Sequence, residues 1–201
     1  DVDVISVFDG PSGRLNQMCV EAGLTAMPPI DMVAEVPYDV LNNVQFASLM
    51  IGVIKKRPGL VILAPECTKW SKAQDFNNKR PGAKEALQKG RDEQRRIMKR
   101  VNALLRAVWR YGGEAIIENP YESYLWKQEF CKQMQDDLPA GRTFRDFKLN
   151  MCMVGSQYFK PVRLRTTLPA ILTGDLEQLC DHKEPHPPCG GRSDDGKPRT
   201  R

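Results

Sequence analysis

The fold follows from the stretch LVILAPECTKWS, residues 60–71. Residues 60–64 form a continuous apolar run, which is typical of a strand buried on both faces in a parallel sheet. Pro65 then stiffens the chain, and Cys67 stands among polar neighbours in the loop that follows. Ligands of open α/β sheets bind beyond the carboxyl ends of the strands, so this loop is a candidate site of chemistry.

Strand and helix patterns alternate on both sides of this run. Apolar or β-rich runs predict strands at 2–8, 32–36, 60–64, 114–120, 147–155 and 160–168, and helical spacing predicts helices at 14–24, 46–56, 84–111 and 121–137. This alternation predicts right-handed βαβ units. The expected fold is therefore α/β, with a mostly parallel sheet and helices on both faces.

Length and composition indicate one globular domain of ordinary size. The chain has 201 residues, and its 30 Lys and Arg against 25 Asp and Glu give a net charge of +5, which is compatible with a polyanionic partner. No apolar run approaches the ~18 residues needed to cross a bilayer. The acidic opening is too short for a signal peptide. We therefore expect no membrane partner and an intracellular protein, in the cytoplasm or the nucleus.

The six cysteines do not form the dense framework of a small disulfide-rich domain. Cys19, Cys131 and Cys152 lie in apolar patterns that are typical of packed core residues. Cys67 does not, because its neighbours are polar. A thiolate at the carboxyl edge of a sheet is a candidate nucleophile, so attack is the better interpretation of Cys67.

The chain after the first predicted strand is rich in glycine. FDGPSG, residues 8–13, joins that strand to a helix through Gly10 and Gly13. Glycines at this position let the backbone approach a ligand and aim helix N–H groups at it. The same pattern also occurs in a plain glycine turn, so both interpretations stay open.

Carboxylates follow two other predicted strands. Glu35 closes the run 32–36, where a carboxylate can accept hydrogen bonds from ribose hydroxyls or can simply be a surface residue, and Asp39 carries the same ambiguity. Glu118 ends the strand at 114–120. A carboxyl group at the same sheet edge as a cysteine can serve as a general acid or as a hydrogen-bond partner of a ring nitrogen.

Taken in order, these motifs resemble those of the DNA cytosine-5 methyltransferase family over roughly residues 4–168. FDGPSG resembles the family's FxGxG cofactor loop, PECTKWS resembles its PPCQxFS nucleophile loop around Cys67, and ENP resembles its ENV. VRLR at 162–165 can be aligned with the end of QxRxR, which places Arg163 and Arg165 at its arginines.

The resemblance implies a Rossmann-like fold and covalent catalysis on a pyrimidine. By similarity, Cys67 would add to carbon 6 of cytosine, Glu118 would hold or protonate ring nitrogen 3, and Arg163 or Arg165 would orient the base. The expected partner is nucleic acid, with DNA favoured over RNA, and the target base would be flipped or single-stranded. The residues that would bind S-adenosylmethionine are Phe8, Gly10, Gly13, Glu35, Asp39 and Pro65.

The sequence also departs from the family pattern. Glu66 stands where the family has proline, beside the proposed thiolate, and Pro161 stands where QxRxR has its glutamine. Too little chain follows the arginines for the family's target-recognition region, so the protein would either recognise little sequence or borrow recognition from a partner or a flanking segment. The sequence is similar to the compact catalytic domains of phage and mobile-element proteins, whose shared pattern would include Asn77 and Trp126.

Two alternatives remain open at this point. The first is a catalytically inactive module that binds nucleic acid or cofactor, which the departure at Glu66 and the missing recognition region favour. The second is an amino-group methyltransferase, because NPY at 119–121 resembles the [DN]PP[YF] loop of those enzymes. That chemistry needs no cysteine.

The chain divides into a catalytic domain at 1–179 and a tail at 180–201 that is rich in Cys, His and Pro. The tail contains the pattern Cys180-x-His182-xxx-His186-xx-Cys189. Two thiolates and two imidazoles form a closed structural zinc set, although incidental residues in a flexible tail would give the same sequence. The last dozen residues are expected to be disordered.

Overall fold

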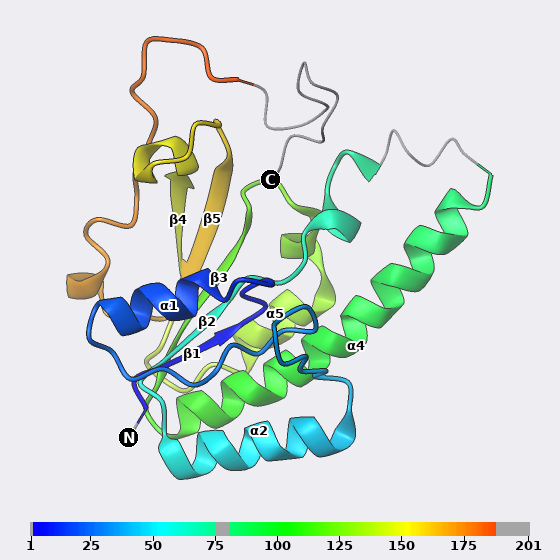
Figure 1. The fold of residues 1–201 in the computed structure, drawn as a ribbon, viewed down its shortest axis with the longest axis vertical. Coiled ribbons are helices and arrows are strands. Elements are labelled where there is room, and N and C mark those ends of the chain that lie inside the picture. Colours follow the sequence, from blue (N-terminus) through cyan, green and yellow to red (C-terminus); the bar gives the residue numbers. More distant parts are fainter. Residues whose placement is uncertain (1, 75–80, 188–201) are drawn as a thin grey trace.

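The computed structural model describes residues 2–74 and 81–187. Its centre is a five-stranded sheet in the order β1-β2-β3-β5-β4 (Figure 1). The strands are β1 (Val4–Val7), β2 (Leu60–Leu63), β3 (Glu114–Pro120), β4 (Arg145–Asn150) and β5 (Pro161–Thr166). β1, β2 and β3 run parallel, whereas β5 runs antiparallel to both of its neighbours, β3 and β4. The predicted α/β class is confirmed, and the antiparallel strand makes the sheet mixed.

Helices cover the sheet unequally. The α-helices are α1 (Arg14–Glu21), α2 (Asn43–Lys56), α4 (Ala83–Arg110) and α5 (Glu129–Asp136). Short 3-10 turns are η1 (Thr68–Trp70), η2 (Tyr124–Lys127), η3 (Met151–Val154) and η4 (Ala170–Leu172). α2 and α5 pack on the long helix α4, and α1 packs on β1 from the other side of the sheet (Figure 1). Across 2–74 and 81–187, no helix combines the length and apolar character that crossing a membrane requires.

The main core lies between one face of the sheet and α4. The strand register places Ile5, Val61 and Ala115 in one row across β1, β2 and β3. These side chains are buried together with Met98 and Leu105 of α4. A 28-residue helix with this apolar stripe is stabilised chiefly by such packing, because helix propensity alone contributes little.

The opposite face is less covered beyond β1. All four residues of β1 are buried, but β2 alternates, with Val61 and Leu63 buried and Leu60 and Ile62 only half-buried. The apolar run at 60–64 was expected to be buried on both faces. The difference arises because α1 is short and packs on β1, so this face of β2 receives less cover.

The predicted strand at 32–36 is wrong. The segment beside β1 lies earlier, where Ala26 and Ile30 form isolated parallel bridges with Val4 and Val7. Residues 32–36 form turns instead, with Val36 77% exposed. The edge segment carries the two prolines of PPI, which cannot donate ladder hydrogen bonds, and this explains why it forms bridges rather than a full strand.

Other boundaries shift by a few residues. The predicted helix at 121–137 begins only at Glu129, after the turn η2, and the predicted strand at 147–155 ends at Asn150, where η3 begins. α2 begins three residues earlier than the predicted 46 because the Asn42 side chain accepts hydrogen bonds from the Val44 and Gln45 N–H groups. This N-cap is a recognisable sequence signal.

Candidate functional site

The loop that follows β2 is anchored in the core by its far end. We call residues 64–71 the Cys67 loop. Trp70 is buried and meets Phe130 edge-on, with ring centroids 6.1 Å apart. The guanidinium groups of Arg91 and Arg95 lie over the Trp70 ring, 5.2 and 5.5 Å from its centroid. The aromatic anchor therefore limits the freedom of a loop that would otherwise be mobile.

Two buried side chains fix the backbone just before Cys67. The Asn119 amide at the end of β3 donates a hydrogen bond of 2.7 Å to the Pro65 carbonyl. Gln94 of α4 donates one of 2.5 Å to the Glu66 carbonyl. Both amides are almost fully buried, so each bond also satisfies a polar group that would be costly to leave unpaired.

Cys67 itself is half-buried and lines a hollow of about 600 Å³, which we call the Cys67 pocket. Its volume is typical of small-ligand sites. Cys131, by contrast, is buried in the core, and burial raises the pKa of its thiol to about 12. The expected packing role of Cys19 and Cys131 agrees with their burial, whereas Cys67 is accessible from its pocket.

The Cys67 pocket combines aromatic faces with lysines. The loop after β3 contributes Tyr121, and the loop between β4 and β5 contributes Tyr158 and Phe159. Lys72 and Lys160 also line it. Aromatic rings with nearby ammonium groups suit a flat base attached to a phosphate backbone.

An ion pair spans the pocket between the loops after β2 and β3. The Lys72 ammonium donates a hydrogen bond to the Glu122 carboxylate, and this contact lowers the pKa of that carboxyl. Both side chains are more than half exposed, so solvent screens the pair strongly. The pair joins the two loops at the surface, above the buried bond from Asn119 to Pro65.

Glu66 faces away from the Cys67 pocket. Its carboxylate lies 3.6 Å from the Lys69 ammonium and is 57% exposed. Glu66 lines a second hollow, of about 440 Å³, which we call the Asp31 pocket. That pocket is formed by Phe8, Asp31, Met32, Val33, Ala64, Pro65, Glu66, Lys69, Gly90, Glu93, Gln94 and Ile97. The Cys67 loop thus separates the two hollows, with Glu66 on one side and Cys67 on the other.

Asp31 occupies the position that the sequence suggested for Glu35. Its carboxylate accepts hydrogen bonds from the Gly10 N–H (2.8 Å) and the Val33 N–H (2.9 Å) and borders the Asp31 pocket. Glu35 instead lines a separate hollow of about 340 Å³. Sequence reasoning missed Asp31 because the strand was placed too late. The signal was present, since an acidic residue directly follows the apolar Ile30.

Of the other residues expected to bind cofactor, Phe8 and Pro65 line the Asp31 pocket and Asp39 does not. One oxygen of the Asp39 carboxylate accepts a hydrogen bond from the Leu41 N–H in a local turn. Phe8 has φ 65°, a left-handed conformation that is rare outside glycine and strained for an aromatic residue. Such strain is concentrated at functional sites.

The glycine turn after β1 has a different electrostatic role from the one its sequence suggests. The Asp9 carboxylate accepts hydrogen bonds from the Leu15 and Asn16 N–H groups at the start of α1. The protein's own anion therefore occupies this helix terminus. Gly13 has φ 54°, and a Cβ there would lie 3.0 Å from Pro29, which accounts for the glycine.

Glu118 lies at the carboxyl end of β3 with its side chain largely shielded. Burial raises the pKa of its carboxyl, and the nearby Lys160 ammonium partly offsets that shift. Because Lys160 lines the Cys67 pocket, Glu118 is electrostatically linked to the same pocket. A raised pKa favours the protonated form of the carboxyl, which is the form that a general acid requires.

The structure separates the two arginines from Glu118. In the register, Glu118 pairs with Leu164, so the alternation of β5 places Arg163 and Arg165 on the opposite face of the sheet. Arg165 forms a bidentate pair with Asp146 at 2.7 and 2.8 Å.

Both arginines pack on aromatic rings close to the Cys67 pocket. Both guanidinium groups lie over the Trp126 ring, each 5.2 Å from its centroid, and Arg163 also lies 4.9 Å from the centroid of Tyr121. Arg163 therefore supports Tyr121, which lines the Cys67 pocket, and Arg165 shares the Trp126 ring with it. Trp126 is buried and donates a 2.9 Å hydrogen bond to the Pro120 carbonyl. Asn77 lies outside the described residues.

A separate group of thiols and imidazoles lies beside η3. The sulfurs of Cys152 and Cys180 and a ring nitrogen each of His182 and His186 lie within 4.8 Å of one another, and we call this group the Cys/His cluster. The imidazoles lower the pKa of the Cys180 thiol to about 6. Three of the four tail residues expected to bind metal are therefore brought together. Cys189 and the tail expected to be disordered lie outside the described residues.

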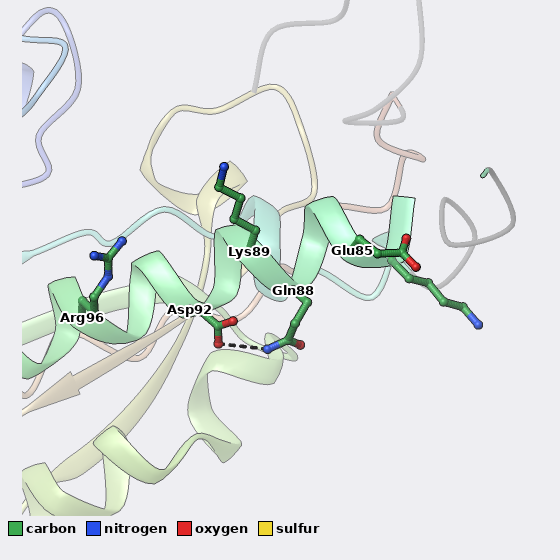
Figure 2. Close-up of a pocket in the computed structure, with 6 residues that line it drawn as sticks. Glu85, Gln88, Lys89, Asp92 and Arg96 are labelled. Carbon is green, nitrogen blue, oxygen red and sulfur yellow. Dashed lines mark hydrogen bonds between the residues drawn. The ribbon is translucent and has the colours of Figure 1, made fainter. Parts of the chain in front are cut away.

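A further hollow, of about 740 Å³, runs along the exposed side of α4 (Figure 2). Its lining residues are Lys84, Glu85, Gln88, Lys89, Asp92 and Arg96. All belong to one helix and carry both signs of charge, and Gln88 donates a 2.9 Å hydrogen bond to Asp92. This surface agrees with the solvated helix face that the charge pattern indicates.

No protein-family model matches this sequence, and no curated protein matches it either. The function must therefore be argued from the two pockets and the residues that border them.

The bond from Asn119 to Pro65 makes a prediction for loop rigidity. Asn119→Ala removes a buried donor and leaves the Pro65 carbonyl unpaired, so we expect a loss of about 1–3 kcal/mol in the free energy of unfolding. Urea denaturation measures this loss. Mass spectrometry after brief alkylation should also show faster labelling of Cys67. The exposed control Gln88→Ala should change the free energy by less than about 0.5 kcal/mol and leave labelling unchanged.

The raised pKa of Glu118 predicts a specific pH trend. When the pKa of a carboxyl is higher in the folded state, the protein loses stability as pH rises from the unfolded-state pKa, about 4.3 for Glu, through the folded-state pKa. Glu118→Gln removes this titration. The variant should therefore gain stability relative to the wild type as pH rises above the unfolded pKa, as measured by urea denaturation at each pH.

Glu122→Gln provides the matched control with the opposite sign. Lys72 lowers the pKa of Glu122, so the charged carboxylate contributes stability above the unfolded-state pKa. Glu122→Gln removes this contribution. The variant should therefore become less stable relative to the wild type as pH rises. A difference between Glu118→Gln and wild type that stays constant with pH would contradict the prediction.

Proposed function

We propose that this protein transfers a methyl group from S-adenosylmethionine to carbon 5 of cytosine in DNA, by way of a covalent bond to Cys67. The observation that carries the proposal is a half-buried cysteine on a loop fixed by Asn119 and Gln94, opening onto a pocket of aromatic rings and lysines. The proposal includes a Rossmann-like methyltransferase fold, for which the three parallel strands and the sites at their carboxyl ends are the support.

The Cys67 pocket is the proposed site of the base. A base within a duplex cannot reach such a hollow, so the target would be flipped out or single-stranded. Tyr121, Tyr158 and Phe159 offer faces for stacking, and Lys72 and Lys160 offer positive charge to the backbone. DNA is preferred to RNA on the family resemblance alone, and sequence recognition would come from a partner or a flanking segment.

The Asp31 pocket is the proposed site of S-adenosylmethionine. Asp31 stands at the end of the segment beside β1, where an acidic residue can accept hydrogen bonds from ribose hydroxyls. The start of α1 is already neutralised by Asp9, which disfavours a cofactor bound there by phosphate and suits one without phosphate. The two pockets lie on either side of the Cys67 loop, so the proposed donor and acceptor would occupy neighbouring sites and the methyl group would pass between them beside this loop.

In the proposed reaction, the thiolate of Cys67 forms a bond to carbon 6 of cytosine, and the electron pair of the C5–C6 double bond moves toward carbon 5. Glu118 donates a proton to ring nitrogen 3 as that atom gains electron density. S-adenosylmethionine supplies the methyl group that carbon 5 takes up. Methyl transfer would leave S-adenosylhomocysteine. Loss of the carbon 5 proton to solvent, return of the proton on ring nitrogen 3 to the Glu118 carboxylate and cleavage of the bond between Sγ and carbon 6 would then restore the C5–C6 double bond and release the methylated base and the Cys67 thiolate.

The residues around the thiolate have supporting roles in this scheme. Glu66 pairs with Lys69 at 3.6 Å and lines the Asp31 pocket, whereas Cys67 lines the other hollow. Arg163 and Arg165 are positioning residues that hold the aromatic wall, since Asp146 occupies both guanidinium groups. The orientation of Glu66 weakens the argument for an inactive binding module.

The amino-group alternative is less well supported. It depends on the NPY loop at 119–121, but the Asn119 amide is buried and donates to Pro65. The side chain is therefore committed to holding the Cys67 loop and is not presented to a substrate.

A covalent trap tests the proposed function. Incubation with labelled S-adenosylmethionine and an oligonucleotide that contains 5-fluorocytosine should give a denaturant-resistant adduct, because fluorine at carbon 5 cannot leave as a proton. Cys67→Ser should abolish the adduct, and the control Cys19→Ser should retain it. Methyl transfer without any adduct would indicate amino-group chemistry. Binding without transfer would indicate the inactive module.

The cofactor site gives a separate prediction. Asp31→Asn keeps the size of the side chain but removes its charge, so S-adenosylmethionine and S-adenosylhomocysteine should bind about tenfold more weakly, a change of about 1.4 kcal/mol. Isothermal titration calorimetry measures the affinity. Glu35→Gln is the control and should bind as the wild type does. Equal weakening in both variants would contradict the assignment of Asp31.

A further inference from the structure

We propose that Cys152, Cys180, His182 and His186 bind one Zn²⁺ ion that fixes a wall of the Cys67 pocket. Three of these residues lie in the segment that follows β5, whereas Cys152 belongs to η3 in the loop from β4 to β5. The ion would therefore join two segments that are distant in sequence. This assignment differs from the tail pattern alone, in which Cys189 was the fourth ligand.

The backbone brings the two segments together before any metal is considered. The Asn150 N–H donates to the Gln178 carbonyl (2.9 Å), and the Gln178 N–H donates to the Lys148 carbonyl (3.2 Å). Gln178 thus pairs with the edge of β4 beside Leu149. Two residues later, Cys180 reaches the start of η3, where Cys152 lies. The juxtaposition follows from strand register and not from a chance approach of the tail.

The ligand atoms have the chemistry of a structural zinc site and lie close to its spacing. Zinc binds thiolate sulfur at about 2.3 Å and imidazole nitrogen at about 2.0–2.1 Å, so the ligand atoms of a tetrahedral site lie about 3.3–3.8 Å apart. The Cys180 sulfur lies 3.3 Å from Nδ1 of His182 and 3.1 Å from Nε2 of His186. Two thiolates and two neutral imidazoles also cancel the charge of Zn²⁺.

The cluster is connected directly to the Cys67 pocket. His186 stacks on Phe159, with ring centroids 5.8 Å apart and an angle of 18° between the planes. Phe159 lines the pocket together with Met151, Tyr158 and Lys160 of the same loop. The Met151 N–H donates to the Lys160 carbonyl (3.1 Å), which closes the loop on itself. An ion bound at Cys152 would therefore hold this loop at its base and, through His186, at its tip.

Metal content tests the ligand set without any assay of activity. Purified wild-type protein should contain one zinc per chain by native mass spectrometry. Replacement by Co²⁺ should give the absorption of a tetrahedral site with two thiolates. Cys152→Ser should lower zinc occupancy at least tenfold. In the cobalt-substituted variant, the thiolate-to-cobalt absorption per bound cobalt ion should fall by about half, since one of two sulfurs is lost. Cys19→Ser and Cys189→Ser should both retain zinc.

The reverse result would overturn the assignment. If Cys189→Ser loses zinc while Cys152→Ser keeps it, the fourth ligand is Cys189; if the wild type holds no zinc, there is no such site. Because Cys152→Ser can disturb folding, His186→Gln serves as a second variant, and circular dichroism checks that both remain folded.

Hydrogen exchange tests the structural role. Removing zinc from wild-type protein with a chelator should increase exchange in residues 151–160 and 177–187 by tenfold or more, with α4 unchanged. Restoring Zn²⁺ should reverse the effect. Unchanged exchange at 151–160 would show that the ion does not hold the pocket wall. Neither measurement depends on methyl transfer, so the failure of one proposal is distinguishable from the failure of the other.

Discussion

The buried hydrogen bond from Asn119 to the Pro65 carbonyl is the contact on which the site depends. β2 and β3 are adjacent and parallel, so both chains leave the sheet at one edge and their loops must share space. The amide ties one loop to the other at their first turn. Trp70 then returns the Cys67 loop to the core. Cys67 lies on an irregular segment, but the contacts on both sides of it fix the position of its backbone.

The same arrangement separates the Glu66 carboxylate from the Cys67 thiol. Glu66 and Cys67 are adjacent in sequence, but the loop turns them toward different hollows, and Lys69 accompanies the carboxylate. Glu118 shows the converse, because it lies 51 positions away along the chain and yet shares the electrostatics of the pocket through Lys160.

The features that the sequence predicted correctly are those that depend on neighbouring residues along the chain. The apolar run at 60–64 and the amphipathic stretch at 84–111 correspond closely to β2 and α4, and the half-buried Cys67 stands where its polar neighbours indicated. The misplaced strand at 32–36 shows the limit of apolar runs as a signal, since Met32, Val33 and Val36 are exposed and the prolines before them shape the edge.

What sequence could not give were relations between distant segments. The face on which Arg163 lies is set by strand parity and register, and a motif alignment contains neither. Cys152 looked like a core residue because its neighbours are apolar, and it is indeed buried. Its approach to Cys180 depends on Gln178 pairing with β4, a contact between segments almost thirty residues apart.

The shared wall between the two pockets has a thermodynamic consequence. Pro65 and Glu66 border one hollow and Cys67 borders the other, so a ligand that displaces this short segment from either side changes the shape of both. The two binding free energies are then linked. Such linkage is reciprocal, and occupancy of the first site alters affinity at the second by the same factor as the reverse. In the proposed scheme, a few residues of one loop would thus couple binding at the two sites.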